Sequence, residues 1–265
     1  MSPLQRYVSG ELTHFVGRSL PPEEQRYSLL VKILTSGWLT HPPHSPNISG
    51  SLSVNTDARI SEDEMYSPEI VCFCDIPVDD LHIHIGKYGR FGLAFLKSFL
   101  VERGANPVFY VARNSTVRVV ADLSDGERLQ EALERLRTLG ADGFLNSVPR
   151  WEHFDKMMRE YHELFKLLGN VIEQQQDSPG VSGDFKRLFD LRWFLDFQVF
   201  SFVKFFDDSK SDEDPESFYM EREWRMLGNL KFGLSDVRRV ILPESHAARL
   251  RKDVPDYVGQ VTFVD

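Results

Sequence analysis

The chain has 265 residues, of which 42% are hydrophobic and 27% charged, with 17 Gly, 14 Pro and 2 Cys. This composition is typical of a globular protein and excludes the collagen-like, mucin-like and disordered classes. The 31 Lys and Arg against 40 Asp and Glu leave a formal net charge of −9, so no overall positive field draws the chain to nucleic acid or to an anionic membrane.

Targeting signals are missing from the sequence pattern. No apolar stretch follows a basic segment at the N-terminus, and no apolar run reaches the roughly 18 residues of a membrane span. We therefore expect a cytoplasmic protein that does not associate with membranes.

The first quarter of the chain predicts a strand, a helix and a second strand. Residues 10–16 alternate as a short strand, with His14 on the side of Leu12 and Val16. Residues 21–37 begin with two prolines and two glutamates and end at a glycine, which predicts a helix. Residues 40–69 read as a long loop, and residues 70–76 as a central, buried strand.

The middle of the chain is mostly helical in pattern. Residues 95–101 predict a helix and residues 107–112 a strand, followed by an amphipathic helix over residues 124–139. Two long aromatic-rich helices are expected at residues 151–176 and 185–206, the second becoming strand-like towards its end.

The last part of the chain carries a charged, alternating segment. Residues 218–226 alternate as a strand, which would place Glu221 and Glu223 on one face. From residue 237 onwards the pattern predicts a strand, a short helix beginning near Pro243 and a final strand.

Two pairs of residues carry metal-ligand chemistry, Cys72 with Cys74 and His82 with His84. Neither pair has the usual zinc spacing, so they are most simply core thiols and exposed loop histidines. The sequence also lacks the glycine-rich nucleotide loops, the H-E-x-x-H zinc signature and the G-x-S-x-G nucleophile turn.

Three short segments resemble the ADP-ribosyltransferase superfamily in their order along the chain: T-H-F at 13–15, K-Y-G-R-F-G-L-A-F at 87–95, and E-R-E-W-R at 221–225. The resemblance implies an α+β fold with a split antiparallel sheet core and flanking helices, and NAD as substrate. It implies that His14 holds the ribose, that Tyr88 stacks on nicotinamide, and that a late glutamate stabilises the transition state. The resemblance implies that residues 1–265 form a single domain, with a long loop at 40–69 and a helical insertion at 150–206.

A carboxylate suits this chemistry because the ribose becomes positively charged as the bond to nicotinamide breaks. By resemblance Glu223 is the first choice of catalytic glutamate, with Glu221 as its competitor. The expected NAD-binding residues are His14, Phe15, Arg18, Tyr88, Gly89, Arg90, Phe91 and Phe95. Arg18, Lys87 and Arg90 are also the first candidates for a local basic cleft that would meet a nucleic-acid target.

Each of these residues also has a simpler structural explanation. A histidine on an apolar strand face is commonly part of the core, and Tyr88 with Gly89 can be no more than a turn. Glu221, Arg222, Glu223 and Arg225 can form a ladder of ion pairs. The S-T-S segment of the arginine-specific transferases is also missing.

A resemblance over residues 12–242 is to the AbiGi family of abortive phage-resistance proteins. It is carried by LTHFVG, VCFCDIP, the H-x-x-x-Y-G-R-F-G-L-A-F segment, ANPVFYV and MEREWRML. The family is described as antitoxins of two-component phage-resistance systems, which implies a partner toxin.

Two functions from different classes follow. The first is a phage-defence enzyme that cleaves NAD and transfers ADP-ribose to a protein or nucleic-acid acceptor, or hydrolyses NAD; the loop at 40–69 would act as its lid or target-recognition element. The second is a non-catalytic antitoxin, or a sensor triggered by a phage protein, that controls a partner toxin.

Overall fold

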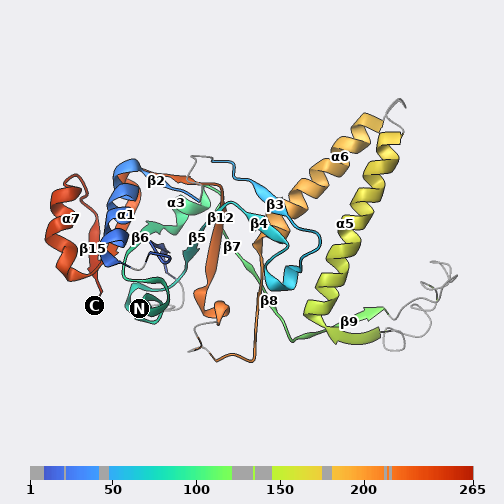
Figure 1. Ribbon diagram of the computed structural model, residues 1–265, viewed down its shortest axis with the longest axis horizontal. Coiled ribbons are helices and arrows are strands. Elements are labelled where there is room, and N and C mark those ends of the chain that lie inside the picture. The colour runs from blue at the N-terminus through green and yellow to red at the C-terminus, as the bar shows by residue number, and fades with distance from the viewer. Residues whose placement is uncertain are drawn as a thin grey trace, which may run out of the picture. The chain divides into compact units, whose positions relative to one another are not determined.

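The computed structural model describes residues 9–20, 22–41, 48–120, 134, 145–174, 181–211, 214 and 217–264. The chain divides into two compact units. We call the first the sheet unit; it comprises Met1–Ser53, Ser67–Phe109 and Ser211–Asp265. The second, the hairpin unit, comprises Val54–Tyr66 and Tyr110–Lys210 and includes the long helices α5 and α6 (Figure 1). The fold is mixed α+β, as the sequence predicts.

A seven-stranded sheet forms the centre of the sheet unit, in the order β15-β14-β6-β1-β5-β12-β7. Neighbouring strands are antiparallel except for β14 and β15, which are parallel. The strands are β1 (Glu11–Phe15), β5 (Ile70–Cys74), β6 (Gly92–Leu96), β7 (Asn106–Pro107), β12 (Glu223–Leu227), β14 (Val237–Leu242) and β15 (Gln260–Phe263). These seven strands thus belong to one sheet, in which β1 and β5 pair at the single position Thr13–Cys74, whereas the resemblance predicted a split sheet.

The first face of the sheet holds the larger hydrophobic core. Leu12, Phe73 and Leu93 lie on this face and are almost fully buried. Helices α1 (Glu23–Ser36), α3 (Lys97–Val101) and α7 (Ala247–Asp253) contribute the apolar side chains that pack against them. Helix α1 begins after Pro22 and ends at Gly37, whose φ of 70° is the left-handed conformation that glycine adopts readily.

The second face carries a smaller core and most of the charged residues. Phe15 and Cys74 lie on this face, against Ile85 of helix α2 (His82–Tyr88). The alternation of strand residues explains the division, because Thr13 pairs with Cys74 while His14 pairs with Leu93 on the other side.

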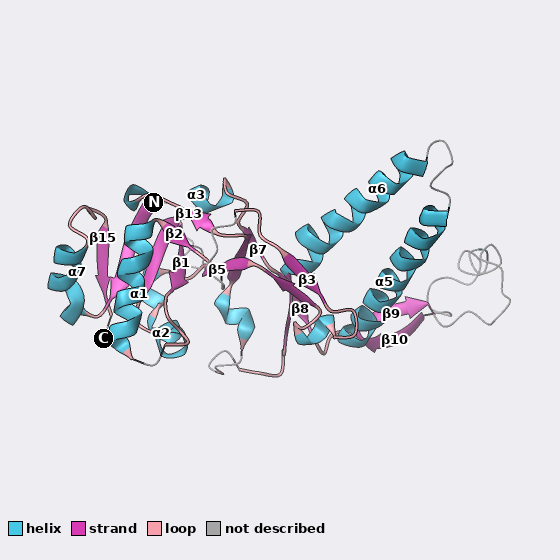
Figure 2. Ribbon diagram, turned by 45° about the horizontal axis from the view of Figure 1, so that its top comes forward, coloured by secondary structure: helices cyan, strands magenta, loops and turns pink. Residues whose placement is uncertain are grey.

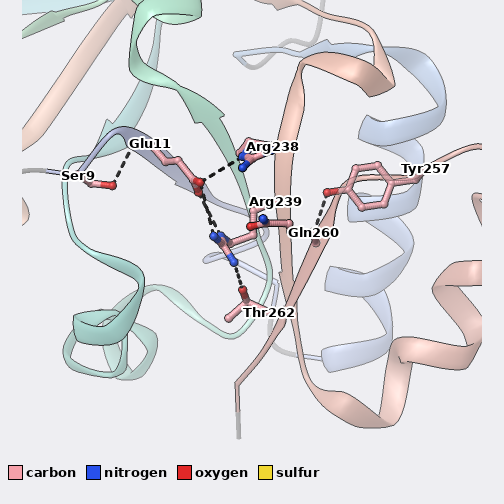
Figure 3. A network of polar contacts seen from close by, with 7 residues as sticks. All are labelled: Ser9, Glu11, Arg238, Arg239, Tyr257, Gln260 and Thr262. Atoms are coloured by element: carbon pink, nitrogen blue, oxygen red, sulfur yellow. Dashed lines mark hydrogen bonds and ion pairs between the residues drawn. The ribbon is translucent and has the colours of Figure 1, made fainter.

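An ion pair crosses the second face over strand β6. Glu11 of β1 accepts a hydrogen bond from Arg239 of β14 at 3.1 Å, and Arg239 also donates to Thr262 of β15 at 2.7 Å (Figure 3). The small residue Ala94, which pairs with Arg239 on β6, leaves room for this contact. The network links strands that are not neighbours in the sheet.

Short two-stranded sheets complete the sheet unit and its borders. β2 (Trp38–Leu39) pairs with β13 (Leu230–Lys231), and β3 (Leu52–Val54) pairs with β4 (Tyr66–Pro68). The segment 40–69 is therefore not a structureless loop in its described part. The polar composition of this segment did not indicate strands β3 and β4, which are each only three residues long.

The hairpin unit combines two small sheets with two long helices (Figure 2). β9 (Thr116–Val120) pairs with β10 (Leu145–Pro149), and β8 (Phe109–Ala112) pairs with β11 (Val203–Phe206). Helices α5 (Arg150–Gln174) and α6 (Val181–Phe194) follow one another in the chain. A buried network joins the middle of α5 to the turn that follows α6, where the Tyr66 hydroxyl contacts His162 at 3.0 Å and Asp196 at 3.1 Å.

Most predicted elements are confirmed, including the two long helices and the strand at the end of the second. The helix predicted at 95–101 begins only at Lys97, because residues 92–96 form strand β6. The helix predicted at 124–139 lies outside the described residues, apart from the helical Glu134.

Candidate functional site

The segment with two glutamates is not one continuous strand. Phe218–Glu221 form a short 3₁₀ helix, and strand β12 begins at Glu223. Arg222 between them has a φ of 46°, the left-handed conformation that non-glycine residues seldom adopt. This turn separates Glu221 from Glu223 and corrects the prediction that both lie on one strand face.

Glu221 is buried against residues at the end of helix α2. Lys87 Nζ lies 2.7 Å from Glu221 Oε1, and the Tyr88 hydroxyl donates a hydrogen bond to the same oxygen. The two charged side chains expose only 14% and 9% of their surface. Solvent therefore screens this ion pair weakly.

The ring of Tyr88 is packed on several sides. It stacks on Phe15 with ring centres 5.5 Å apart and on His84 at 6.2 Å, and the Arg18 guanidinium lies 5.0 Å from its centre. Burial, and then the hydrogen bond to Glu221, raise the pKa of Tyr88 above its usual value. The Tyr88 side chain is therefore neutral and half-buried, and it packs on the second face through Phe15.

Two further carboxylates, Glu223 on this face and Asp75 just beyond the end of β5, are each paired with a cation. Glu223 accepts a hydrogen bond from Arg225 at 2.8 Å, and Asp75 accepts one from Lys97 at 2.8 Å. Asp75 also accepts a hydrogen bond from the backbone N–H of Ser9 and lies 4.0 Å from Arg222. We call Asp75, Glu221 and Glu223, with these partners, the acidic cluster.

His14 lies on the opposite face of the sheet from Glu223. Its Nδ1 donates to the carbonyl of Cys72 at 2.8 Å, and its ring meets Phe73 edge-on at 5.9 Å. Burial is the main influence on its pKa, which is lowered, so the imidazole is favoured in its neutral form. The structure does not bring His14 together with Tyr88 and the glutamates.

The other residues expected to bind NAD are distributed between core and surface. Phe91 and Phe95 are almost fully buried in the first-face core. Gly89 has a φ of 101°, and a side chain there would collide with Arg26. Arg90 forms an ion pair with Glu23. Of the expected residues, Phe15, Arg18 and Glu221 all contact Tyr88.

Sequence reasoning missed several members of the acidic cluster. Asp75 reads only as the end of a strand, and Lys97 as the start of a helix. His84, expected on an exposed loop, is instead a buried residue of helix α2. For Lys87, the sequence did indicate a place near the site, because this residue directly precedes Tyr88.

The cysteine pair does not form a metal site with its neighbours. Cys74 is buried, which raises the pKa of its thiol to about 12, whereas Cys72 is exposed and so is not the core thiol that was expected. Among the described residues, no group of three or more His, Cys, Asp or Glu side chains is arranged to hold a metal ion.

The hairpin unit contains a cavity of about 570 Å³ that the sequence did not indicate. It lies between strands β9 and β10 and the start of α5, and its polar lining includes Arg118, Asn146, Glu152, His153 and Lys156. None of the expected site residues lies there. Of the helices that the structure describes, none has the length and apolar character needed to cross a membrane.

Comparison with known proteins identifies relatives by sequence. The family model described as "Putative abortive phage resistance protein AbiGi, antitoxin" matches residues 51–255. The abortive phage resistance protein AbiGi of Lactococcus lactis subsp. cremoris is 27% identical over 191 residues, covering 68% of this chain and 72% of that protein. No solved structure matches the chain. Because the family model covers well over half of its length, the chain belongs to the AbiGi family of abortive phage-resistance proteins.

Proposed function

We propose that this protein serves phage defence as a non-catalytic binding protein, an antitoxin that controls a partner toxin. The description of its family as an antitoxin supports this function directly. The proposal requires no catalysis by the acidic cluster. It rests on the observation that the carboxylates of this cluster are paired with cations of the same chain.

The carboxylates of the acidic cluster are neutralised by the chain itself. Glu221 is held by Lys87 and Tyr88, Glu223 by Arg225, and Asp75 by Lys97. A glutamate that stabilises a positively charged ribose must direct its negative charge at the substrate. In this cluster that charge is already directed at a neighbouring cation, and His14 lies on the other face of the sheet. The arrangement therefore favours a structural role for these residues.

A binding experiment with two purified proteins tests the antitoxin function. A candidate partner toxin is mixed with the purified chain, and the mixture is analysed by size-exclusion chromatography with light scattering. We expect a stable complex of the two proteins and loss of the toxin's activity in that complex. A toxin that remains separate and fully active in the presence of excess chain would contradict the proposal.

NAD cleavage on an ADP-ribosyltransferase-like core is a second candidate. The contact between Phe15, Tyr88 and Glu221 favours it, because the resemblance links these three segments. In the arrangement described, however, the Tyr88 ring already contacts Phe15, His84 and Arg18. One of these side chains would have to move before nicotinamide could stack on the ring.

Nicotinamide release from NAD by the purified chain tests this candidate, with and without phage lysate and acceptor proteins. Release that disappears in Glu223→Gln or Glu221→Gln would establish the enzyme and overturn the non-catalytic proposal. Absence of release under all of these conditions would count against the enzyme.

A further inference from the structure

The helical hairpin formed by α5 and α6 carries an unusual amount of exposed apolar surface. Ten large hydrophobic side chains on these two helices are between 41% and 60% exposed. They include Leu164, Leu168 and Val171 on α5 and Phe185, Phe189 and Trp193 on α6. Contiguous groups of large exposed apolar side chains are uncommon on soluble monomers and commonly mark interaction sites.

The sequence pattern of α5 is that of a helix with partners on more than one side. Met157, Tyr161, Leu164, Leu168 and Val171 are spaced alternately by four and three residues, which is the seam of a helix that packs on other helices. Met158 and Phe165 widen the apolar stripe beyond this seam, and Met158 is already buried within its own chain. The seam residues Met157, Leu164, Leu168 and Val171 remain exposed and lie along one side of the helix.

Helix α6 covers only part of this surface. Its last turn lies against the middle of α5, where the Arg192 guanidinium is 5.9 Å from the centre of the Phe165 ring and the Tyr161 hydroxyl donates to Asp196, just beyond α6, at 3.1 Å. Phe185, Phe189 and Trp193 form one row along α6, four residues apart, and remain about half exposed. Each helix thus requires a further helical neighbour to bury its apolar residues.

Charge distinguishes this surface from the chain as a whole. Helices α5 and α6 together contain seven Lys or Arg and seven Asp or Glu, whereas the whole chain has a net charge of −9. Two acidic molecules repel one another least where their surfaces carry no net charge. Within α6, Lys186 and Asp190 also form an ion pair, so their charges offset one another. Contact between two neutral, identical hairpins therefore brings no excess of like charge into the interface.

We propose that the occupant of this surface is the α5–α6 hairpin of a second copy of this chain. Two hairpins related by a two-fold axis make a four-helix bundle in which each helix gains the neighbours it lacks. The 14 residues of α6 give a shared length of about 21 Å. Interfaces of obligate homodimers are richer in apolar and aromatic residues than other interfaces, as this surface is. The dimer does not depend on the antitoxin function proposed above.

The oligomeric state of the full chain tests the proposal. The wild type is expected to sediment as a dimer with twice the 30.6 kDa mass of the chain. The variant Val171→Glu, which places a charge in the seam of α5, is expected to sediment as a monomer. Val101→Glu in α3 is the matched control, because Val101 is 50% exposed and Val171 is 51% exposed.

Circular dichroism establishes that each variant is folded, and Phe189→Ser supplies a second, uncharged change on α6. The proposal is supported if Val171→Glu and Phe189→Ser dissociate the dimer while Val101→Glu does not. A wild type that is monomeric at all concentrations would overturn it, since the hairpin is then covered within its own chain or by another protein. A dimer unaffected by both hairpin variants, or dissociated equally by the control, would also overturn it.

Discussion

Glu221 illustrates how one residue can fit two functions until its neighbours are known. In the sequence it is an acidic residue near the position that the transferase resemblance assigns to catalysis. In the structure it is a buried partner of Lys87 and Tyr88 at the edge of the second face. The sequence does not reveal this, because Lys87 and Glu221 are 134 residues apart.

The replacement Glu221→Gln measures the structural role of this residue. It leaves the Lys87 ammonium buried without its counter-charge, which costs about 3 kcal/mol of unfolding free energy for a pair of this kind. Glu24→Gln is the control, because Glu24 pairs with Arg249 at an exposed position and should change stability little. Urea denaturation compares the two variants. Equal stability of both would contradict the structural role.

His14 predicts a pH dependence of stability. Burial lowers its pKa below the usual value of 6.5, so the unfolded chain takes up the proton first as the pH falls. The free energy of unfolding therefore decreases as the pH falls below 6.5. For one proton the decrease is at most about 1.4 kcal/mol per pH unit.

His14→Gln is expected to reduce this loss, because glutamine does not titrate and can still donate to the Cys72 carbonyl. His162 in the hairpin unit has the same direction of shift and remains in both proteins, so the difference between them isolates His14. Urea denaturation of both proteins between pH 7.5 and pH 5 measures it. Parallel pH curves for the two proteins would contradict the assignment.

At the scale of elements, the junction between the 3₁₀ helix at Phe218–Glu221 and strand β12 decides where the two glutamates point. Arg222 supplies the turn at an unfavourable φ, and its guanidinium lies 4.0 Å from Asp75. The alternation of residue types at 218–226 indicated a strand but not the residue at which it begins. The left-handed conformation of Arg222 does not change the hydrophobic pattern, so the pattern could not reveal it.

Substitutions at Arg222 test this junction. Arg222→Gly should be more stable than Arg222→Ala by about 1 kcal/mol, because both lose the contact with Asp75 but only alanine retains the cost of a left-handed backbone. Thermal unfolding of the two variants measures the difference. An alanine variant as stable as the glycine variant would show that this residue does not adopt a left-handed conformation.

The elements themselves were largely predictable. Strand β1, helix α1, strand β5 and helix α5 follow from local patterns of apolar residues, prolines and glycines. The candidate site was less predictable, because pairing decides which face of the sheet a residue occupies. The pairing of Thr13 with Cys74 places His14 on the face opposite Glu223, and such pairing is not a local property.

At the scale of the whole molecule, the chain consists of two compact units with different characters. The sheet unit contains the acidic cluster in a network of ion pairs, and the hairpin unit exposes an apolar, neutral surface. The sequence led us to treat residues 150–206 as an insertion in a single domain. The exposed apolar side chains of the hairpin unit suit binding to another protein.

The most direct measurement of the central claim is relief of toxin-induced growth arrest by co-expression of this chain. The account predicts that the wild type and Glu223→Gln, expressed at equal soluble levels, restore growth equally, because neutralisation depends on binding and not on a catalytic glutamate. Failure of the wild type to restore growth would contradict the antitoxin function. Rescue by the wild type that is abolished in the folded Glu223→Gln variant, together with NAD consumption by the wild type alone, would show that the chain acts as an enzyme.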